Sequence, residues 1–253
     1  MPERATNAQN SDAASRSSAS TPDEVRQWEA DGYLALPGAV GGSHLARLQR
    51  AFDHWAAECK DAWLERVAAG DTAGTYYDIP DPLAKDDAFL GLVDHPSYYD
   101  RLLRFTDGEL LFLAAQVRTV PVWPLAYCSW HPDVGRTNPL HIKVQIYVND
   151  VPPNGGEFAF VPGSHREEPG LRRRPLLTDA MPGGRAFPGS AGDAVVFNAY
   201  GWHTPMQNRT DTPRKSIILI YERATEARRN AERYAHIADR LSDARRQLLG
   251  VAS

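Results

Sequence analysis

The 253-residue chain is 42% hydrophobic and 24% charged, a balance typical of a globular protein with a substantial core. Its 28 basic residues are outnumbered by 32 acidic residues, so a net charge of −4 gives no field that would gather nucleic acid or an anionic membrane. No run approaches the roughly 18 apolar residues that a membrane span needs. Two cysteines, Cys59 and Cys128, are too few for a disulfide framework. We therefore expect a cytoplasmic protein with neither a nucleic-acid nor a membrane partner.

The chain divides into segments of different texture. Residues 1–21 are rich in Ser, Ala and Asn without an apolar run, which favours a disordered tail. We predict one domain after this tail. It begins with a helical part at about 22–108, continues as a β-rich core at about 109–222, and ends in a charged helix at about 223–249.

Helix signals are clear in the first part of the domain. Ser20 or Thr21 can cap a helix, and Pro22 suits its first turn. Apolar residues then recur at spacings of three and four from about 43 to 60, and helical character continues to Gly70. The turn-rich, aromatic stretch at 72–90 is typical of a loop that can cover a site.

Short extended runs dominate the β-rich core. Each is bounded by Gly, Pro, Asn or Asp, as antiparallel strands are. Six or more strands, with preceding helices available to cover one sheet, indicate a mostly β fold with flanking α-helices and a double-stranded β-helix, or jelly-roll, core. The predicted strands are LLFLAAQVRTVPV, AYCSW, HIKVQIYVND, EFAFVPG, DAVVFNAY and RKSIILIYE.

Three side chains in this core could bind a metal ion. His131 and Asp133 are two residues apart, so in an extended segment they point the same way. His203 follows a predicted strand and offers a third ligand. Two histidines and one carboxylate leave open positions on an octahedral ion, as in non-heme Fe(II) oxygenases, whereas a structural zinc site is closed by four ligands. An isolated histidine and aspartate at this spacing can also be an ordinary polar turn.

From WEADGYLALPG to about Glu222 the sequence resembles the phytanoyl-CoA dioxygenase family of Fe(II)- and 2-oxoglutarate-dependent oxygenases. The segments NGGEFAFVPGSH and HTPMQNRTDTPRKSI carry the resemblance together with the His131, Asp133 and His203 pattern. It implies that these three residues are the catalytic iron ligands in a cupin-like fold. It also implies that Arg214 pairs with the distant carboxylate of 2-oxoglutarate, and that O2 is the second cosubstrate.

Other polar residues are candidates for the same site by strand alternation. Ser216 shares a face with Arg214 and could bind the same carboxylate. The resemblance places Gln116 and Gln145 near the cosubstrate. In HIKVQIYVND the polar face looks into the cavity if the valine face packs under helices, but the opposite assignment remains open. Three further candidates for substrate binding are Arg118, Lys143 and Tyr127.

The sequence departs from the family pattern at two positions. Pro132 stands where several relatives carry a glutamine that contacts the cosubstrate, and Pro205 stands where some carry a small hydroxyl residue. These changes imply rearranged cosubstrate contacts with intact iron ligands. Asp133 is retained, which argues against halogenation, because halogenating relatives replace that carboxylate with a small residue.

The resemblance predicts hydroxylation of a small molecule, a specialised metabolite, with release of succinate and CO2. The same cofactor chemistry could instead give epimerisation, cyclisation or desaturation, since the pose of the substrate decides the outcome. A cupin-like binding module without turnover and a zinc hydrolase using the same ligands are the alternatives from other classes. The sequence does not indicate the oligomeric state.

Overall fold

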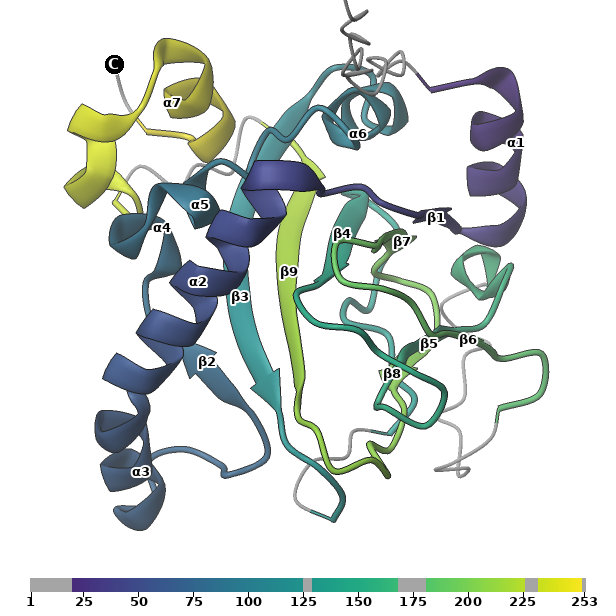
Figure 1. The fold of residues 1–253 in the computed structure, drawn as a ribbon. Helices are drawn as coiled ribbons and strands as arrows, with labels where there is room; N and C mark the ends of the chain where they lie inside the picture. The colour runs from purple at the N-terminus through teal and green to yellow at the C-terminus, as the bar shows by residue number, and fades with distance from the viewer. Residues whose placement is uncertain (1–19, 125–128, 168–180, 226–231, 252–253) are drawn as a thin grey trace, which may run out of the picture.

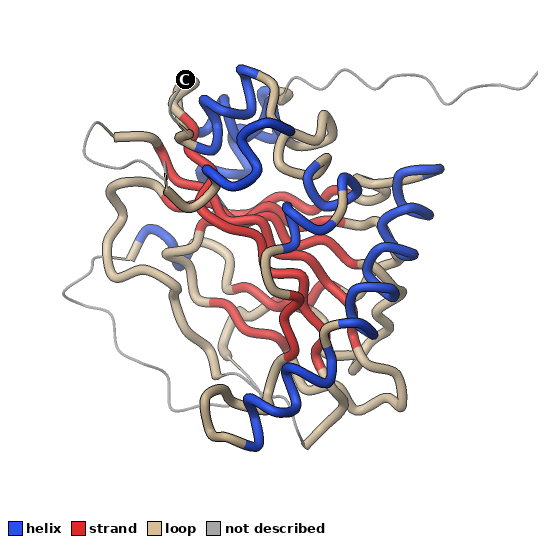
Figure 2. The backbone as a smooth tube through the Cα atoms, turned by 90° about the vertical axis from the view of Figure 1, so that its left-hand side faces the viewer, coloured by secondary structure: helices blue, strands red, loops and turns tan. Residues whose placement is uncertain are grey.

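The computed structural model describes residues 20–124, 129–167, 181–225 and 232–251. Two antiparallel sheets form its centre, and most of the helices lie on the outer side of the larger one (Figure 1). Seen from the side, the helices gather on one side of the strands and long loops lie on the other (Figure 2). The predicted mostly β, jelly-roll fold with flanking helices is confirmed.

The chain enters the larger sheet through a capped helix. Helix α1 (Pro22–Asp31) starts at Thr21, whose side chain accepts a hydrogen bond from the backbone N–H of Glu24, while the Glu24 carboxylate binds the N–H of Thr21. It ends at Gly32, whose φ of 80° turns the chain into strand β1 (Tyr33–Leu36). The start of this helix was predicted.

The other helices cover the outer face of the larger sheet. Helix α2 (Gly42–Glu58) buries Leu48 and Phe52 against that face, as its periodicity predicts. The remaining helices are α3 (Lys60–Ala68), α4 (Pro82–Lys85), α5 (Asp87–Leu90), α6 (Tyr99–Phe105) and α7 (Asp243–Leu249). Among the described residues, no helix is long and apolar enough to cross a membrane.

The larger sheet contains six strands in the order β1-β7-β4-β9-β3-β2, and every neighbouring pair is antiparallel. Its strands after β1 are β2 (Tyr77–Ile79), β3 (Leu110–Val120), β4 (His141–Tyr147), β7 (Ala194–Asn198) and β9 (Arg214–Arg223). Ile142, Val144 and Ile146 of β4 join the main hydrophobic core under the helices. The polar residues of the same strand therefore face the smaller sheet.

The smaller sheet has the order β6-β5-β8 and comprises β5 (Phe158–Phe160), β6 (Arg185–Phe187) and β8 (His203–Pro205). A second hydrophobic cluster fills the space between the two sheets. Within it, the Tyr147 hydroxyl donates to the Phe187 carbonyl oxygen at 2.7 Å and accepts from the Phe158 N–H at 2.9 Å. One phenol of the larger sheet thus joins two strands of the smaller sheet.

Several predicted elements differ from the structure. The continuous helix predicted over 223–249 is wrong: β9 extends to Arg223, and a 3-10 helix (Ala235–Arg240) is separated from α7 by extended Leu241. Ser242 caps α7 by accepting from the N–H of Arg245, so the helix restarts there. The stretch predicted as a loop over 72–90 also contains β2, α4 and α5. Most of the predicted strand AYCSW lies outside the described residues.

Candidate metal and cosubstrate site

Main-chain pairing brings the two candidate histidines together. His203 opens β8, and its N–H and carbonyl form reciprocal hydrogen bonds of 3.0 Å with the carbonyl and N–H of His131. Asp133 is fixed nearby because its N–H donates to the Ala199 carbonyl oxygen at 2.9 Å. One ligand atom from each of His131, Asp133 and His203 lies within 4.8 Å of the other two. The three side chains that the sequence analysis predicted as metal ligands therefore lie close enough together to bind one ion.

The orientation of each imidazole is set by a backbone carbonyl. Nδ1 of His131 lies 2.7 Å from the oxygen of Ser129, and Nδ1 of His203 lies 2.9 Å from that of Gly201. Because a carbonyl oxygen can only accept, both Nδ1 atoms must carry the proton. Each Nε2 faces Asp133: carrying a proton it can bind the carboxylate, and without that proton its lone pair is free for a metal ion.

Asp133 completes a donor set that suits a divalent cation. Its Oδ2 lies 3.0 Å from His203 Nε2, close to the roughly 3 Å expected between adjacent octahedral ligands with bonds of about 2.1 Å. Its Oδ1 lies 3.9 Å from His131 Nε2 and 2.7 Å from Lys143 Nζ. Burial alone would raise the pKa of Asp133, but His203 and Lys143 outweigh it and hold that pKa well below its usual range. The carboxylate is thus ionised and available to a metal ion.

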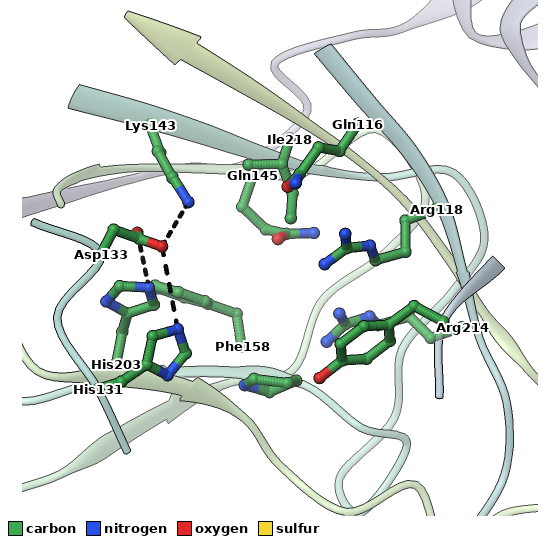
Figure 3. Close-up of a pocket in the computed structure, with 12 residues that line it drawn as sticks. Gln116, Arg118, His131, Asp133, Lys143, Gln145, Phe158, His203, Arg214 and Ile218 are labelled. Carbon is green, nitrogen blue, oxygen red and sulfur yellow. Dashed lines mark ion pairs between the residues drawn. The ribbon is translucent and has the colours of Figure 1, made fainter. Parts of the chain in front are cut away.

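These residues form one end of a cavity of about 170 Å³ (Figure 3). Arg214 and Arg118 lie across the cavity from the three metal-ligand candidates, and Gln116 and Gln145 lie between the two ends. The polar face of β4 therefore faces the cavity, which settles the alternative that the sequence left open for this strand.

The Arg214 end of the cavity has buried polar atoms without partners. The Arg214 side chain is only 3% exposed, and burial lowers its pKa. Its Nη1 donates to the Gly156 carbonyl oxygen, but its Nε has no hydrogen-bond partner among the described residues. Nε2 of Gln145, which lies between the two ends, also has no partner among the described residues, and neither does Oγ of Ser216, a fully buried residue of β9 that does not line the cavity. Each such group costs about 1–3 kcal/mol unless something binds it, so an anionic ligand with several oxygens fits this end.

The remaining sequence candidates have other surroundings. Arg118 lines the cavity, but its Nε and Nη2 both bind the carboxylate of Asp78 on β2 at 2.6 Å, and its guanidinium lies 4.4 Å from the centre of the Tyr76 ring. Lys143 binds Asp133. Tyr127 lies outside the described residues. Sequence reasoning identified the loop carrying Tyr76 as a possible cover, but it gave no sign that Asp78 would pair with Arg118.

Sequence reasoning also missed the apolar lining of the cavity. Phe158 and Ile218 both line it, and so does Pro205. Phe158 opens β5 of the smaller sheet, and the centre of its ring lies 5.9 Å from that of His203. The sequence segment around Phe158 reads as an ordinary buried strand, so nothing in its pattern distinguishes a cavity residue from a core residue.

A double-sheet jelly roll with two histidines and one carboxylate at the mouth of its cavity is the architecture of cupin-like non-heme metal enzymes. The family profile described as "Phytanoyl-CoA dioxygenase (PhyH)" matches residues 28–216. The chain belongs to this family, as the sequence resemblance predicts.

Several solved structures have similar folds. The carbocyclase SnoK from nogalamycin biosynthesis has a TM-score of 0.66 and 19% identity, covering 91% of this chain and 94% of that chain. The epimerase SnoN, in complex with Fe3+, alpha ketoglutarate and nogalamycin RO, has a TM-score of 0.58 and 22% identity, covering 79% and 82%. HygX from Streptomyces hygroscopicus, with nickel, 2-oxoglutarate and hygromycin B bound, has a TM-score of 0.59 and 17% identity, covering 80% and 87%. At these identities the likeness shows the fold.

Proposed function

We propose that this protein is an Fe(II)- and 2-oxoglutarate-dependent oxygenase that acts on a small organic molecule. The observation that carries the proposal is the placement of two complementary sites in one cavity. The ligand set of His131, Asp133 and His203 forms one end, and the buried guanidinium of Arg214 forms the other. A short dicarboxylate with a metal-chelating end satisfies both ends at once.

Arg214 is the residue that would hold the far carboxylate of 2-oxoglutarate. Its planar guanidinium can donate to two carboxylate oxygens, and it is buried from competing water. The amide of Gln145 lines the same cavity, and its Nε2 has no partner among the described residues. Ser216 follows Arg214 by two residues on the same face of β9, which supports a contact of its hydroxyl with the same carboxylate. Bound iron would supply the activation of O2, coupled to oxidation of the keto acid to succinate and CO2. The protein's own part is to bind and orient.

Hydroxylation is the proposed reaction, with epimerisation, cyclisation or desaturation as the alternative outcomes of the same chemistry. The retained carboxylate of Asp133 supports an oxygenase rather than a halogenase. The carbocyclase and the epimerase among the similar folds show that this scaffold supports more than one outcome. Those two proteins and HygX act on or bind natural products, which supports a specialised metabolite as the substrate here.

The first test is spectroscopic. Anaerobic addition of Fe(II) and then 2-oxoglutarate to the wild-type protein should produce the weak visible charge-transfer band of a chelated ferrous complex. His131→Ala should abolish this band, because it removes one of three ligands. His236→Ala is the matched control, since His236 lies on the surface and pairs with Asp81.

A wild-type protein without the band would refute the proposed use of 2-oxoglutarate. An unchanged band in His131→Ala would show that iron binds elsewhere. If the band forms normally but no succinate is released with any candidate metabolite under O2, the non-catalytic binding module becomes the better description.

A further inference from the structure

Lys143 is a cation placed directly on a metal-ligand carboxylate. Its Nζ lies 2.7 Å from Oδ1 of Asp133, and its side chain is 12% exposed. The register of the larger sheet puts Ile220 of β9 and Phe197 of β7 opposite Lys143 on either side. Figure 3 shows the lysine reaching the Asp133 carboxylate, and its two cross-strand partners are apolar.

The two oxygens of Asp133 have different surroundings. Oδ2 lies 3.0 Å from Nε2 of His203, whereas the nearest contact of His131 Nε2 is with Oδ1, at the longer distance of 3.9 Å. Oδ1 is the oxygen that receives the ammonium of Lys143. Carboxylates can bind a cation through one oxygen or through both. An ammonium bound to Oδ1 opposes the rotation that would turn both oxygens toward the same ion.

Metal affinity does not explain a lysine at this place. A positive charge within hydrogen-bond distance of a ligand carboxylate repels the incoming dication and reduces the negative charge that attracts it. A neutral donor, such as a backbone N–H, would fix the carboxylate without that repulsion. The lysine also fixes the orientation of the carboxylate, because its Nζ binds one of the two oxygens.

We propose that Lys143 is a positioning residue that restricts Asp133 to ligation through one oxygen and so keeps a coordination position open. This inference rests on the proposed function, because the open position matters only when a two-atom chelator takes the other two. With both carboxylate oxygens on the ion, two histidines and a chelating 2-oxoglutarate would fill six positions and leave none for O2. Lys143 is thus assigned to the iron ligand, not to the substrate.

The test uses nitric oxide as a probe of the last open position. Wild type, Lys143→Met and Lys143→Arg are loaded anaerobically with Fe(II) and 2-oxoglutarate, and nitric oxide binding is followed by electron paramagnetic resonance. The expected result is that Lys143→Met weakens nitric oxide binding about tenfold or more, because a carboxylate ligating through both oxygens would occupy the position that nitric oxide needs. Lys143→Arg keeps a cationic donor and should bind nitric oxide within about threefold of wild type.

Metal affinity provides the second readout. Removing the ammonium should leave Fe(II) binding to Lys143→Met as tight as in wild type or tighter, because a repulsive charge is lost. Lys143→Gln is a second neutral variant for use if Lys143→Met does not fold, and it should behave as Lys143→Met does in both readouts.

Two results would overturn the inference. One is unchanged nitric oxide binding in the neutral variants, which would show that Asp133 needs no lysine to stay a one-oxygen ligand. The other is weaker Fe(II) binding with a matching loss of nitric oxide, which would make Lys143 a general support of the ligand set. If the proposed function is wrong, the wild-type protein will lack the 2-oxoglutarate charge-transfer band. That result is distinct from either of the two above.

Discussion

Gly201 lies two residues before the metal-ligand candidate His203, and the absence of its side chain makes room for a core ring. A Cβ atom at this position would lie 2.2 Å from Cζ and 2.4 Å from Cε2 of Phe160, whose side chain is fully buried. The Gly201 carbonyl also accepts the hydrogen bond from Nδ1 of His203. A shift of this residue would therefore move the acceptor that orients the imidazole.

We predict that Gly201→Ala lowers the free energy of unfolding by about 1–3 kcal/mol through overpacking and also weakens metal binding. Urea denaturation and titration with Co(II) measure the two effects. Gly135→Ala is the control, because a Cβ atom there meets no other atom within 4 Å. Normal Co(II) affinity in Gly201→Ala would show that the backbone can shift without turning His203.

At the level of residues, the sequence was enough to identify the candidate metal ligands and the candidate 2-oxoglutarate-binding arginine. His131, Asp133, His203 and Arg214 belong to a spacing pattern that the fold brings to one cavity. Partnerships across strands were not predictable. Lys143 contacts Asp133 because the chain between Asp133 and β4 turns back on itself. No local sequence pattern predicts that turn.

Among the elements, the turn between α5 and α6 carries a half-buried histidine, His95. The ring of His95 lies 5.1 Å from that of His44 on α2, and its Nδ1 lies 2.9 Å from Oγ of Ser97. Burial is the main cause that lowers the pKa of His95 to about 4; His44 lowers it further, and Asp94 partly opposes the shift. The folded protein therefore keeps this imidazole neutral where an unfolded chain, with a pKa near 6.5, would be protonated.

Because the unfolded chain binds the proton first, His95 should make the protein less stable as the pH falls from about 6.5 to 4. We predict a loss of about 1–3 kcal/mol from this residue over that interval. Urea denaturation at several pH values should show a shallower decline in His95→Gln than in wild type. His54→Gln is the control, because His54 is exposed on α2. Equal slopes in all three proteins would contradict the assignment.

Long elements with strong periodicity were predicted well, and short ones were not. The start of α1 and the span of α2 followed from a cap and an apolar stripe. Strands β6 and β8 have three residues each, too few to show an alternation, and they exist because β5 pairs with both. The prediction of one helix over 223–249 was wrong. The apolar residues do have a helical spacing, but those of the described part lie in two separate short helices, a 3-10 helix and α7.

On the scale of the whole molecule, the site depends on both sheets. His203 belongs to the smaller sheet, and Arg214 opens a central strand of the larger one. In the proposed function, metal and 2-oxoglutarate would bind across the space between the sheets, and binding to the folded state alone would add stability by mass action. The layered fold could be predicted from the strand pattern, but the closeness of these two ends depended on strand order, which the pattern does not fix.

We predict that Ni(II), an oxygen-stable substitute for iron, raises the melting temperature and that 2-oxoglutarate raises it further only with the metal present. A ligand at about 100 times its Kd contributes about 2.7 kcal/mol, or roughly 5–10 °C for a domain of this size. Arg214→Ala should keep the Ni(II) increment and lose most of the second. Arg223→Ala, at the exposed end of the same strand, should keep both. A full second increment in Arg214→Ala would show that 2-oxoglutarate is held elsewhere.

The reciprocal amide and carbonyl contacts between His131 and His203 have a further consequence. The spacing of the two side chains is dictated by the peptide framework, which does not depend on what those side chains are. Exchanging one imidazole for another donor, such as a thiolate or a carboxylate, would therefore redirect the centre to other ions without rebuilding the scaffold. Such exchange offers a short mutational route from one redox chemistry to another within a single chain.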